Sequence, residues 1–259
     1  SSNRVFPAKE LKPIDVLNKI TEHLTAKDVR FKLDTQWTGW NTKGHLCFND
    51  SEAFDSEITV FARGCASWKV TGSDGEWAKP FTACGVSVRP FRPANCAFGV
   101  DWNKNFIKAH EGKPLKNIAL AYNGYFSKGE LVISKFGLEG NAIYALSQKI
   151  QETLLTKEST VIYLDLKPTM TVDQIRTKYN SSQLSDVTAI LKKDLNLNRT
   201  SIGLLKQFSD KNTFFDPALL TATIKSAPVV IHSAAALDEA ISTLGGIALD
   251  EIDENLQYK

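Results

Sequence analysis

The sequence predicts a mixed fold of α/β and α+β class, in which an α/β part is followed by an antiparallel β part and a helical part. Three observations indicate this. Expected strands and helices alternate through the first third of the chain. Beyond residues 89–93, apolar residues recur at every second position, which is typical of antiparallel strands. Residues 169–227 instead show apolar residues at the three- and four-residue spacing of helices.

The first third contains one expected helix and several expected strands. Residues 14–24 place apolar side chains on one helix face behind Pro13, which a first helical turn tolerates. Residues 29–33 alternate apolar and charged side chains, which predicts a half-buried strand, and residues 37–48 predict a hairpin or meander that turns near residues 41–44. The apolar run at residues 58–62 predicts a buried strand. Together they indicate an open α/β sheet that includes a β-meander.

The rest of the chain divides at prolines. Pro90 and Pro93 are expected to interrupt regular structure and to mark a domain boundary. The elements expected after them are strands at 96–100, 118–122, 131–134, 161–166 and 229–231, helices at 143–154, within 169–227 and at 237–241, and a glycine turn at 244–247. Asp216 followed by Pro217 predicts a capped helix start.

Composition places the chain among ordinary globular proteins. It has 259 residues, of which 42% are hydrophobic and 23% charged, and its net charge is +2. Scattered Lys and Arg give no electrostatic indication of a nucleic acid or membrane partner. No apolar run reaches the ~18 residues that span a bilayer, and no signal peptide is visible, so we expect a soluble cytoplasmic protein. The four cysteines lack metal-ligand spacing, so we expect reduced thiols and no metal site.

The stretch at residues 58–83 is the strongest candidate for a ligand site. The expected strand ends in the small-residue turn 63–67, and Gly72 to Gly75 open an expected helix. Such a turn lets a ligand approach the backbone, and a helix N-terminus favours an anionic or phosphate-bearing ligand. The same residues also serve the geometry of an ordinary turn, so both interpretations stay open.

Other side chains give little indication of chemistry. The four histidines lie far apart and share no acid or serine in a known catalytic spacing, so surface or capping roles are expected. The five tryptophans favour core packing. The alternative is a β domain that binds a glycan or peptide through its Trp and Tyr residues, and loss of glycan binding in Trp102→Ala would support it. Neither G-x-G-x-x-G nor G-x-x-x-x-G-K-[ST] is present.

A series of short motifs resembles a known family in order and spacing. The motifs are Arg4-Val-Phe-Pro7, Trp37-x-Gly-Trp40, Gly64-Cys-Ala-Ser-Trp68, Gly72-Ser-Asp-Gly75, Arg92-Pro-Ala-Asn-Cys96, Gly137-Leu-Glu-Gly140, Ala142-Ile-Tyr-Ala-Leu-Ser147, and Asp238-Glu-Ala-Ile-Ser242 with Gly245-Gly246. Over essentially the whole chain, this series resembles the YhiN/BaiN-like family of NAD(P)/FAD-dependent flavoproteins.

The resemblance implies a partial FAD-binding domain of the two-dinucleotide-binding type that is interrupted by a large insert. Residues 1–92 and 240–259 would belong to the FAD domain, residues 93–168 to an antiparallel β insert with its return strand at 228–239, and residues 169–227 to a helical insert. The implied cofactor is FAD, with NAD(P) as a candidate redox partner and a small molecule as substrate. The implied FAD contacts are the backbones of Gly64, Ser67, Gly72 and Gly75, then Gly245 and Gly246 near the flavin ring, with Arg4 as a further candidate.

The sequence also departs from the family pattern. The family's N-terminal G-x-G-x-x-G strand would lie before Ser1 and its closing glycine-rich segment after Lys259, so the resemblance implies an internal fragment that does not retain FAD. Cys65 stands where the family favours glycine. Two functions are therefore expected as alternatives: hydride transfer in an FAD-dependent oxidoreductase with a nicotinamide or oxygen partner, or non-catalytic binding of a ligand or partner by the isolated chain. No residue is marked as a catalytic acid or base.

Overall fold

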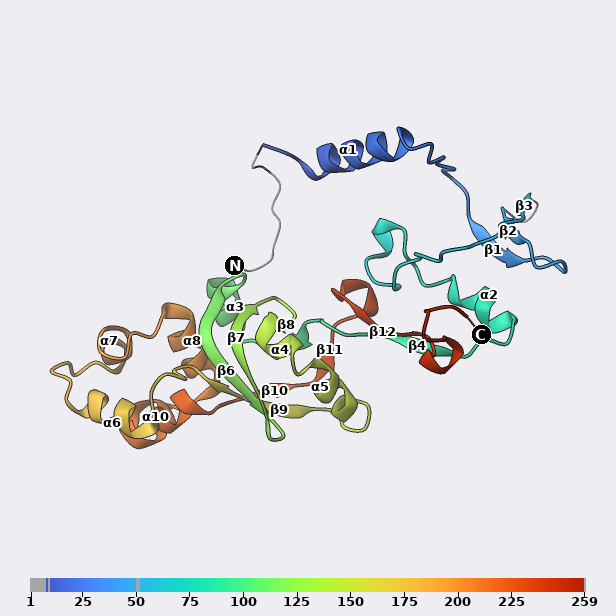
Figure 1. Ribbon diagram of the computed structural model, residues 1–259. Helices are drawn as coiled ribbons and strands as arrows, with labels where there is room; N and C mark the ends of the chain where they lie inside the picture. Colours follow the sequence, from blue (N-terminus) through green and yellow to red (C-terminus); the bar gives the residue numbers. More distant parts are fainter. Residues whose placement is uncertain (1–7, 9, 50–51, 259) are drawn as a thin grey trace. The chain divides into compact units, whose positions relative to one another are not determined.

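The computed structural model describes residue 8, residues 10–49 and residues 52–258 (Figure 1). The contacts within the chain divide it into two compact units, Ser1–Thr59 and Val60–Lys259. Each unit is described by itself below.

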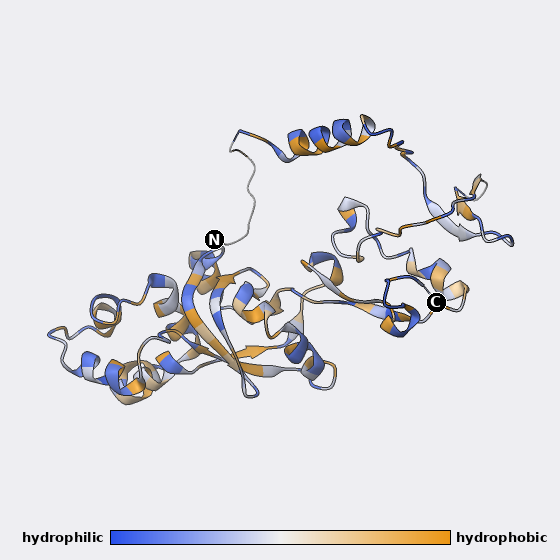
Figure 2. Ribbon diagram, in the orientation of Figure 1, coloured by the Kyte–Doolittle hydropathy of each residue, from blue (hydrophilic) through white to orange (hydrophobic). Residues whose placement is uncertain are grey.

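The first unit contains one helix and a small meander. Helix α1 (Pro13–Thr25) begins as predicted, with Pro13 in the first turn and the Asp15 carboxylate accepting a hydrogen bond of 2.8 Å from the Lys12 backbone N–H. Strands β1 (Trp37–Trp40), β2 (Leu46–Phe48) and β3 (Glu52–Phe54) pair antiparallel in that order, which confirms the expected hairpin. Figure 2 shows an apolar and a polar face on α1, and no residue of this helix is buried.

Two strands that the sequence predicts in the first third do not form. Residues 29–33 and 58–62 lie outside the helices and strands of the structure, and Leu33, Ile58 and Val60 are about four-fifths exposed. A strand needs a neighbour for its backbone hydrogen bonds, and no described strand lies beside these segments. The prediction of an open α/β sheet is therefore wrong for the described residues, in which the sheets are antiparallel.

The second unit is built around a seven-stranded sheet with the order β10-β9-β6-β7-β8-β5-β11. Its strands are β5 (Phe98–Gly99), β6 (Pro114–Tyr122), β7 (Tyr125–Ile133), β8 (Gly137–Glu139), β9 (Thr160–Asp165), β10 (Ala227–Ile231) and β11 (Ser233–Ala234). All pairings are antiparallel, as the period of two predicts. Asn123 and Gly124, both with positive φ, join β6 to β7 in the two-residue turn that suits the twist of a hairpin.

The second unit also contains helices between the strands of the sheet. Several of them begin at a residue whose side chain caps the helix. They are α3 (Lys104–His110), α4 (Asn141–Tyr144), α5 (Ser147–Leu154), α6 (Val172–Asn180), α7 (Val187–Lys193), α8 (Arg199–Phe208), α9 (Lys211–Phe215) and α10 (Pro217–Lys225). The Asp216 carboxylate accepts a hydrogen bond of 2.8 Å from the Leu219 N–H, which confirms the predicted cap of α10. Figure 1 shows α6, α7, α8 and α10 gathered at one end of the sheet.

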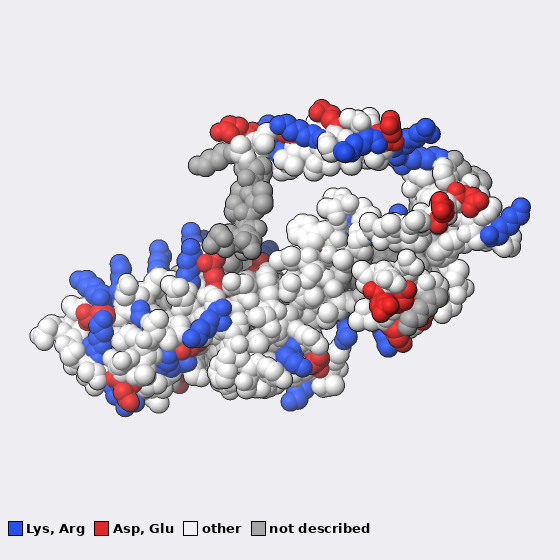
Figure 3. Space-filling model, viewed as in Figure 1, with Lys and Arg blue, Asp and Glu red and all other residues white. Residues whose placement is uncertain are grey.

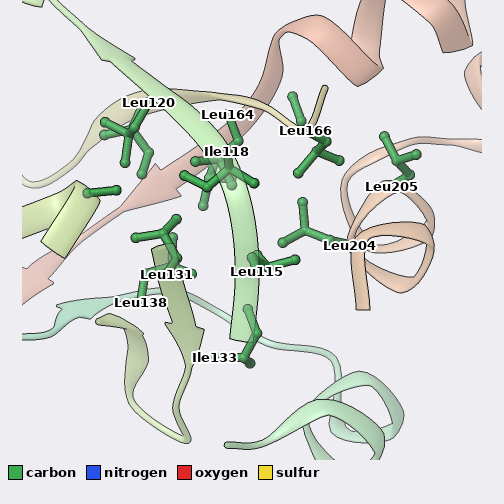
Figure 4. Packing of buried hydrophobic residues seen from close by; sticks show 14 of the residues in the cluster. Leu115, Ile118, Leu120, Leu131, Ile133, Leu138, Leu164, Leu166, Leu204 and Leu205 are labelled. Atoms are coloured by element: carbon green, nitrogen blue, oxygen red, sulfur yellow. The ribbon is translucent and has the colours of Figure 1, made fainter. Parts of the chain in front are cut away.

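The core of this unit lies between the sheet and these helices. Leu115, Ile118 and Leu120 of β6 are fully buried, and Leu204 and Leu205 of α8 meet them from the helical side (Figure 4). Burial of each such side chain contributes about 1.5–3 kcal/mol. The sheet and the helices therefore share one hydrophobic core.

A second, two-stranded sheet lies outside this core. Strands β4 (Val88–Pro93) and β12 (Thr243–Ile247) pair antiparallel, and we call the pair the ribbon. The expectation that Pro90 and Pro93 interrupt regular structure is wrong, because each strand of a two-stranded sheet is an edge that can contain proline. Gly245 and Gly246 lie within a strand and not in a turn, and the pairing shifts its register between Leu244 and Gly246.

Short helical segments complete the second unit. They are η1 (Lys69–Thr71), α2 (Ala78–Ala83), η2 (Leu237–Glu239) and η3 (Leu249–Glu251). The helix expected at residues 237–241 is thus a single 3-10 turn. Among the helices that the structure describes, none is both long and apolar enough to cross a membrane.

Candidate functional site

Residues 63–75 form a loop that closes on itself through one hydroxyl group. Ser73 Oγ donates a hydrogen bond of 2.8 Å to the carbonyl oxygen of Arg63 and accepts one of 3.2 Å from the backbone N–H of Ala66. The residues of this loop with a left-handed backbone are Gly64, Ala66, Trp68, Gly72 and Gly75. Such conformations are accessible to glycine at little cost, which explains why the segment is rich in glycine. We call residues 63–75 the glycine loop.

The glycine loop is fastened to the ribbon and to η2. Thr243 Oγ1 donates a hydrogen bond of 2.8 Å to the carbonyl oxygen of Cys65. Asp238 receives two backbone N–H groups, that of Trp68 at its carbonyl oxygen (3.2 Å) and that of Lys69 at its carboxylate (2.7 Å). Lys69 and Asp238 are 169 positions apart in the sequence, so the tertiary structure brings these two segments together.

Two aromatic rings lie between the two predicted glycine groups. Phe91 of β4 and Trp77 meet edge to face, with 5.6 Å between their ring centroids. A Cβ atom added to Gly75 would lie 3.1 Å from the Phe91 ring, and one added to Gly246 would lie 3.7 Å from the same ring and 3.8 Å from Trp77. The structure therefore brings Gly75 of the loop and Gly246 of β12 against the same Phe91 ring.

Packing within the chain already requires three of the predicted glycines. A Cβ atom at Gly64 would lie 2.6 Å from Ser73 Oγ, one at Gly75 would lie 2.6 Å from the Ala66 methyl group, and one at Gly245 would lie 2.4 Å from the Pro90 carbonyl oxygen. Such separations are too short for any real Cβ contact. For these positions, packing within the chain accounts for the glycine without a ligand.

Gly72 differs from these glycines because it faces open space. Its φ is +97°, and a Cβ atom there would have no neighbour within 4 Å. Gly72 is exposed, as are Gly64 and Gly245, whereas Gly246 is buried against the two rings. Gly72 is thus the position of the glycine loop where a ligand could reach the backbone without disturbing the packing of the loop.

The helix that was expected to start at Gly72 to Gly75 does not form there. The 3-10 turn η1 ends just before Gly72, and the next helix, α2, begins at Ala78 and has six residues. Because the strand expected at residues 58–62 is also absent, the strand, turn and helix arrangement that suits a phosphate group is not formed in the described residues. Ser67 is half-buried, and Arg4 lies outside the described residues.

Local sequence patterns do not mark Thr243 and Phe91 as residues of this site, and Asp238 is marked only as part of the family-like motif at residues 238–242. Asp238, Thr243 and Phe91 act through contacts with other segments of the chain, and no periodic pattern reveals such contacts. The buried Trp77 Nε1 also belongs here, because it has no hydrogen-bond partner among the described residues. A buried donor of this kind marks a place where the structure leaves one polar group unsatisfied.

Two histidines lie in settings that the sequence does not indicate. His232 Nε2 lies 3.2 Å from an Asp101 carboxylate oxygen, and His232 Nδ1 lies 3.1 Å from Ser233 Oγ, which is an acid, base and hydroxyl series. The Asp101 side chain is 98% exposed, so water competes for the carboxylate that would orient the imidazole. His110 is buried and not on the surface.

Trp102 is a packing residue and not an aromatic platform. Its Nε1 donates a hydrogen bond of 2.9 Å to the Ser134 carbonyl oxygen, and its ring lies 5.0 Å from that of Phe106 and 5.9 Å from that of Phe208. These contacts use both the donor and the faces of the indole. The expectation of core packing is confirmed for this residue, so Trp102 is not available as a platform for a glycan or peptide.

Neither the cysteines nor the acidic residues form a metal centre in the part of the chain that the structure describes. All four thiols are free, with Cys65 and Cys84 exposed and Cys96 buried. Burial raises the pKa of the Cys96 thiol, which keeps it protonated. No described group of three or more His, Cys, Asp and Glu side chains could hold a metal ion.

A comparison with protein families now assigns the central part of the chain. The sequence model of the HI0933-like protein barrel and H2TH domain matches residues 92–242, which is more than half of the chain. The chain belongs to the HI0933-like family. This family is flavoprotein-associated and of the YhiN/HI0933 type. No curated protein matches the chain.

The HI0933-like match covers the seven-stranded sheet and the helices α3 to α10. It begins at Arg92, within β4, and ends at Ser242, immediately before β12. The glycine loop and the pair Gly245 and Gly246 therefore lie outside the matched segment, one group on each side of it. The candidate site is formed where the two segments that flank the HI0933-like domain meet.

Proposed function

We propose that this chain acts in an FAD-dependent oxidoreductase and that the glycine loop, fastened to the ribbon, forms one wall of the flavin site. Bound FAD would supply hydride transfer, with a small organic molecule as substrate and a nicotinamide or oxygen as second partner. The family is associated with FAD-dependent oxidoreductases, and this supports the cofactor class. The protein would hold FAD and the substrate in position and would provide the electrostatic environment of the flavin.

The observation that supports the site best is the meeting of the two glycine groups. The hydrogen bond from Thr243 to Cys65 fastens the loop beside the strand that contains Gly245. Exposed backbone without side chains at Gly64, Gly72 and Gly245 would let a flat cofactor approach closely. This surface fits one side of FAD, and the chain contains no G-x-G-x-x-G loop to bind the pyrophosphate group.

Gly72 offers a direct test because a side chain can be added there without a clash. Gly112 is a matched control, since it also has a positive φ and open space around its Cα atom but lies between α3 and β6. Asparagine tolerates a left-handed backbone better than other side chains, so Gly72→Asn and Gly112→Asn should strain the backbone to a similar degree.

The measurement is a titration of FAD against the purified protein, followed by flavin fluorescence. Although the resemblance implies that the chain does not retain FAD by itself, the proposed site should bind FAD added in excess. We expect a loss of affinity of about tenfold or more in Gly72→Asn from the blocked approach, and wild-type affinity in Gly112→Asn. Equal affinity of the two variants would remove Gly72 from the site. Absence of any FAD binding by folded wild-type protein would refute the proposal for this chain.

A second candidate function is non-catalytic binding of a ligand or partner by the isolated chain. It is favoured by the packing of Gly64, Gly75 and Gly245, which explains these residues without a cofactor. The same titration separates the two functions, because tight FAD binding by this chain would exclude the second. Circular dichroism of the titrated sample shows that a negative result comes from folded protein.

A further inference from the structure

A lysine-lined cavity lies at the junction of the sheet and the helical part, away from the glycine loop. Its volume is about 580 Å³, and its walls come from β6, β7, the segment after β9 and the start of α8. Lys116, Lys128 and Lys167 line it, and none of its lining residues is an Asp or Glu. We call it the lysine cavity.

Two irregular backbone positions shape the lysine cavity. The pairing of β6 with β7 shifts its register between Leu115 and Ile118, and Asn117 within this bulge has a φ of +54°. Asn196, which also lines the cavity, has a φ of +49°. A bulge redirects the side chains next to it, so the bulge in β6 allows Lys116 to line the cavity.

The positive charge in the cavity is only partly compensated. Lys116 Nζ lies 3.8 Å from a Glu130 carboxylate oxygen, in a pair that is largely exposed. Asp165, the nearest acidic residue along the chain to Lys167, is engaged by Lys225 at 2.5 Å. Within the described residues, no carboxylate lies within ion-pair distance of Lys128 or Lys167. Burial lowers the pKa of Lys167, and the positive charge of Lys178 lowers it further.

Neutral hydrogen-bonding groups accompany the lysines. Asn117, Asn196 and Ser201 line the same cavity. Asn198 caps α8, a helix of ten residues, by accepting a hydrogen bond of 2.8 Å from the Ser201 N–H, so the first turn of this helix also faces the cavity. Ammonium groups and amide donors together match the oxygen atoms of a phosphate group.

We propose that the lysine cavity binds a phosphorylated small molecule. The negative charges of its phosphate groups would pair with Lys128 and Lys167, which have no carboxylate partner among the described residues. The volume lies within the range of about 300–1,000 Å³ that small-molecule sites occupy. On the face that Figure 3 shows, Lys and Arg side chains gather over the helical end, with single Asp and Glu side chains among them. The three lysines line the same hollow, and a hollow of this size favours a compact polyanion. This proposal does not depend on the flavin site.

Isothermal titration calorimetry of the whole chain with inorganic pyrophosphate, and with ADP as an organic phosphate, tests the proposal. The variants are Lys167→Gln, the double variant Lys128→Gln/Lys167→Gln, and Lys193→Gln as a control of equal charge change on the exposed end of α7. We expect a loss of affinity of about tenfold from Lys167→Gln, no measurable binding by the double variant, and wild-type affinity in the control, because each lysine supplies one charge-assisted hydrogen bond.

Three outcomes would overturn the proposal. One is no binding of either phosphate compound at low salt by folded wild-type protein. The second is an equal loss in Lys167→Gln and Lys193→Gln, which would show that general charge and not the cavity is responsible. The third is tighter binding of a short single-stranded oligonucleotide that all variants weaken alike, which would indicate a nucleic acid surface. Unfolding curves of every variant identify any loss that comes from misfolding.

Discussion

The Thr243 hydroxyl donates a hydrogen bond of 2.8 Å to the carbonyl oxygen of Cys65, across 178 positions of sequence. This bond fastens the glycine loop to β12. Asp238 adds two bonds to the same loop from the segment before β12. The position of the loop therefore depends on Asp238, near the end of the HI0933-like segment, and on Thr243, the first residue after it.

Replacing Thr243 by valine should loosen the glycine loop while the shape of the side chain is kept. We expect the missing hydrogen bond to lower the free energy of local unfolding by about 1 kcal/mol in the loop, while the sheet core keeps its stability. Hydrogen exchange should then be faster at the amides of residues 63–75. Thr82→Val is the control, because the Thr82 hydroxyl donates its hydrogen bond to the Ala78 carbonyl oxygen within α2. Unchanged exchange in the loop would show that Thr243 does not hold it.

Alanine at Gly75 should destabilise the protein more than alanine at Gly72. Both positions have a positive φ, but a Cβ atom at Gly75 would clash with the Ala66 methyl group and one at Gly72 would not. In Gly72→Ala, we expect backbone strain to lower the free energy of unfolding by about 1 kcal/mol. In Gly75→Ala, overpacking should lower it by a further ~1–3 kcal/mol. Urea unfolding measures both variants. Equal midpoints would contradict the close packing of the loop.

Acid should weaken this protein through His110. The imidazole is buried, and Nδ1 lies 3.3 Å from Thr200 Oγ1. Burial lowers the pKa of His110, and the positive charge of Arg199 adds to the effect. The unfolded state then binds the proton more readily than the folded state, so this contribution to stability is complete above the unfolded value of 6.5 and falls as the pH drops below it.

The measurement for His110 is the urea midpoint at several pH values between about 7.5 and about 5.0. The glutamine in His110→Gln cannot gain the proton. The urea midpoint of this variant should therefore fall less between neutral and acidic pH than that of the wild type. His23→Gln, at an exposed position of α1, serves as the matched control. Identical slopes for the wild type and His110→Gln would assign the acid sensitivity to other groups.

Replacing Lys225 should lower the free energy of unfolding more than replacing a lysine of an exposed ion pair. Lys225 Nζ lies 2.5 Å from Asp165 and donates to the Lys167 carbonyl oxygen at 3.1 Å, and both side chains of the pair are about four-fifths buried. Lys225→Met leaves the Asp165 carboxylate without this partner, and we expect a loss of about 2–3 kcal/mol of unfolding free energy. Lys149→Met, which breaks the exposed pair with Glu152, should cost less than about 1 kcal/mol. Equal costs from thermal or urea unfolding would show that burial does not strengthen the role of Lys225.

Local features of the fold followed from the sequence. The helix start at Pro13, the cap at Asp216 and the hairpin between residues 37 and 48 were predicted because each depends on residues a few positions apart. The antiparallel strands of the central sheet were predicted for the same reason, since their alternation is visible within each segment.

Features that require a distant partner did not follow. The apolar runs at residues 29–33 and 58–62 have the composition of strands, but a strand forms only where a neighbouring backbone is present. Pro90 was expected to end regular structure, yet it lies in β4 because a two-stranded ribbon consists of edges. Composition reports what a segment can form, and pairing decides what it does form.

The candidate sites show the same division. The sequence by itself determined which positions are glycine, where helices are capped, and which family pattern the chain resembles, because these depend on residue type and local spacing. Only the tertiary structure decided that Thr243 and Asp238 hold the glycine loop, and that Lys116, Lys128 and Lys167 line one cavity. Those contacts join residues far apart in the chain, and the folding of the backbone between them sets which side chains meet.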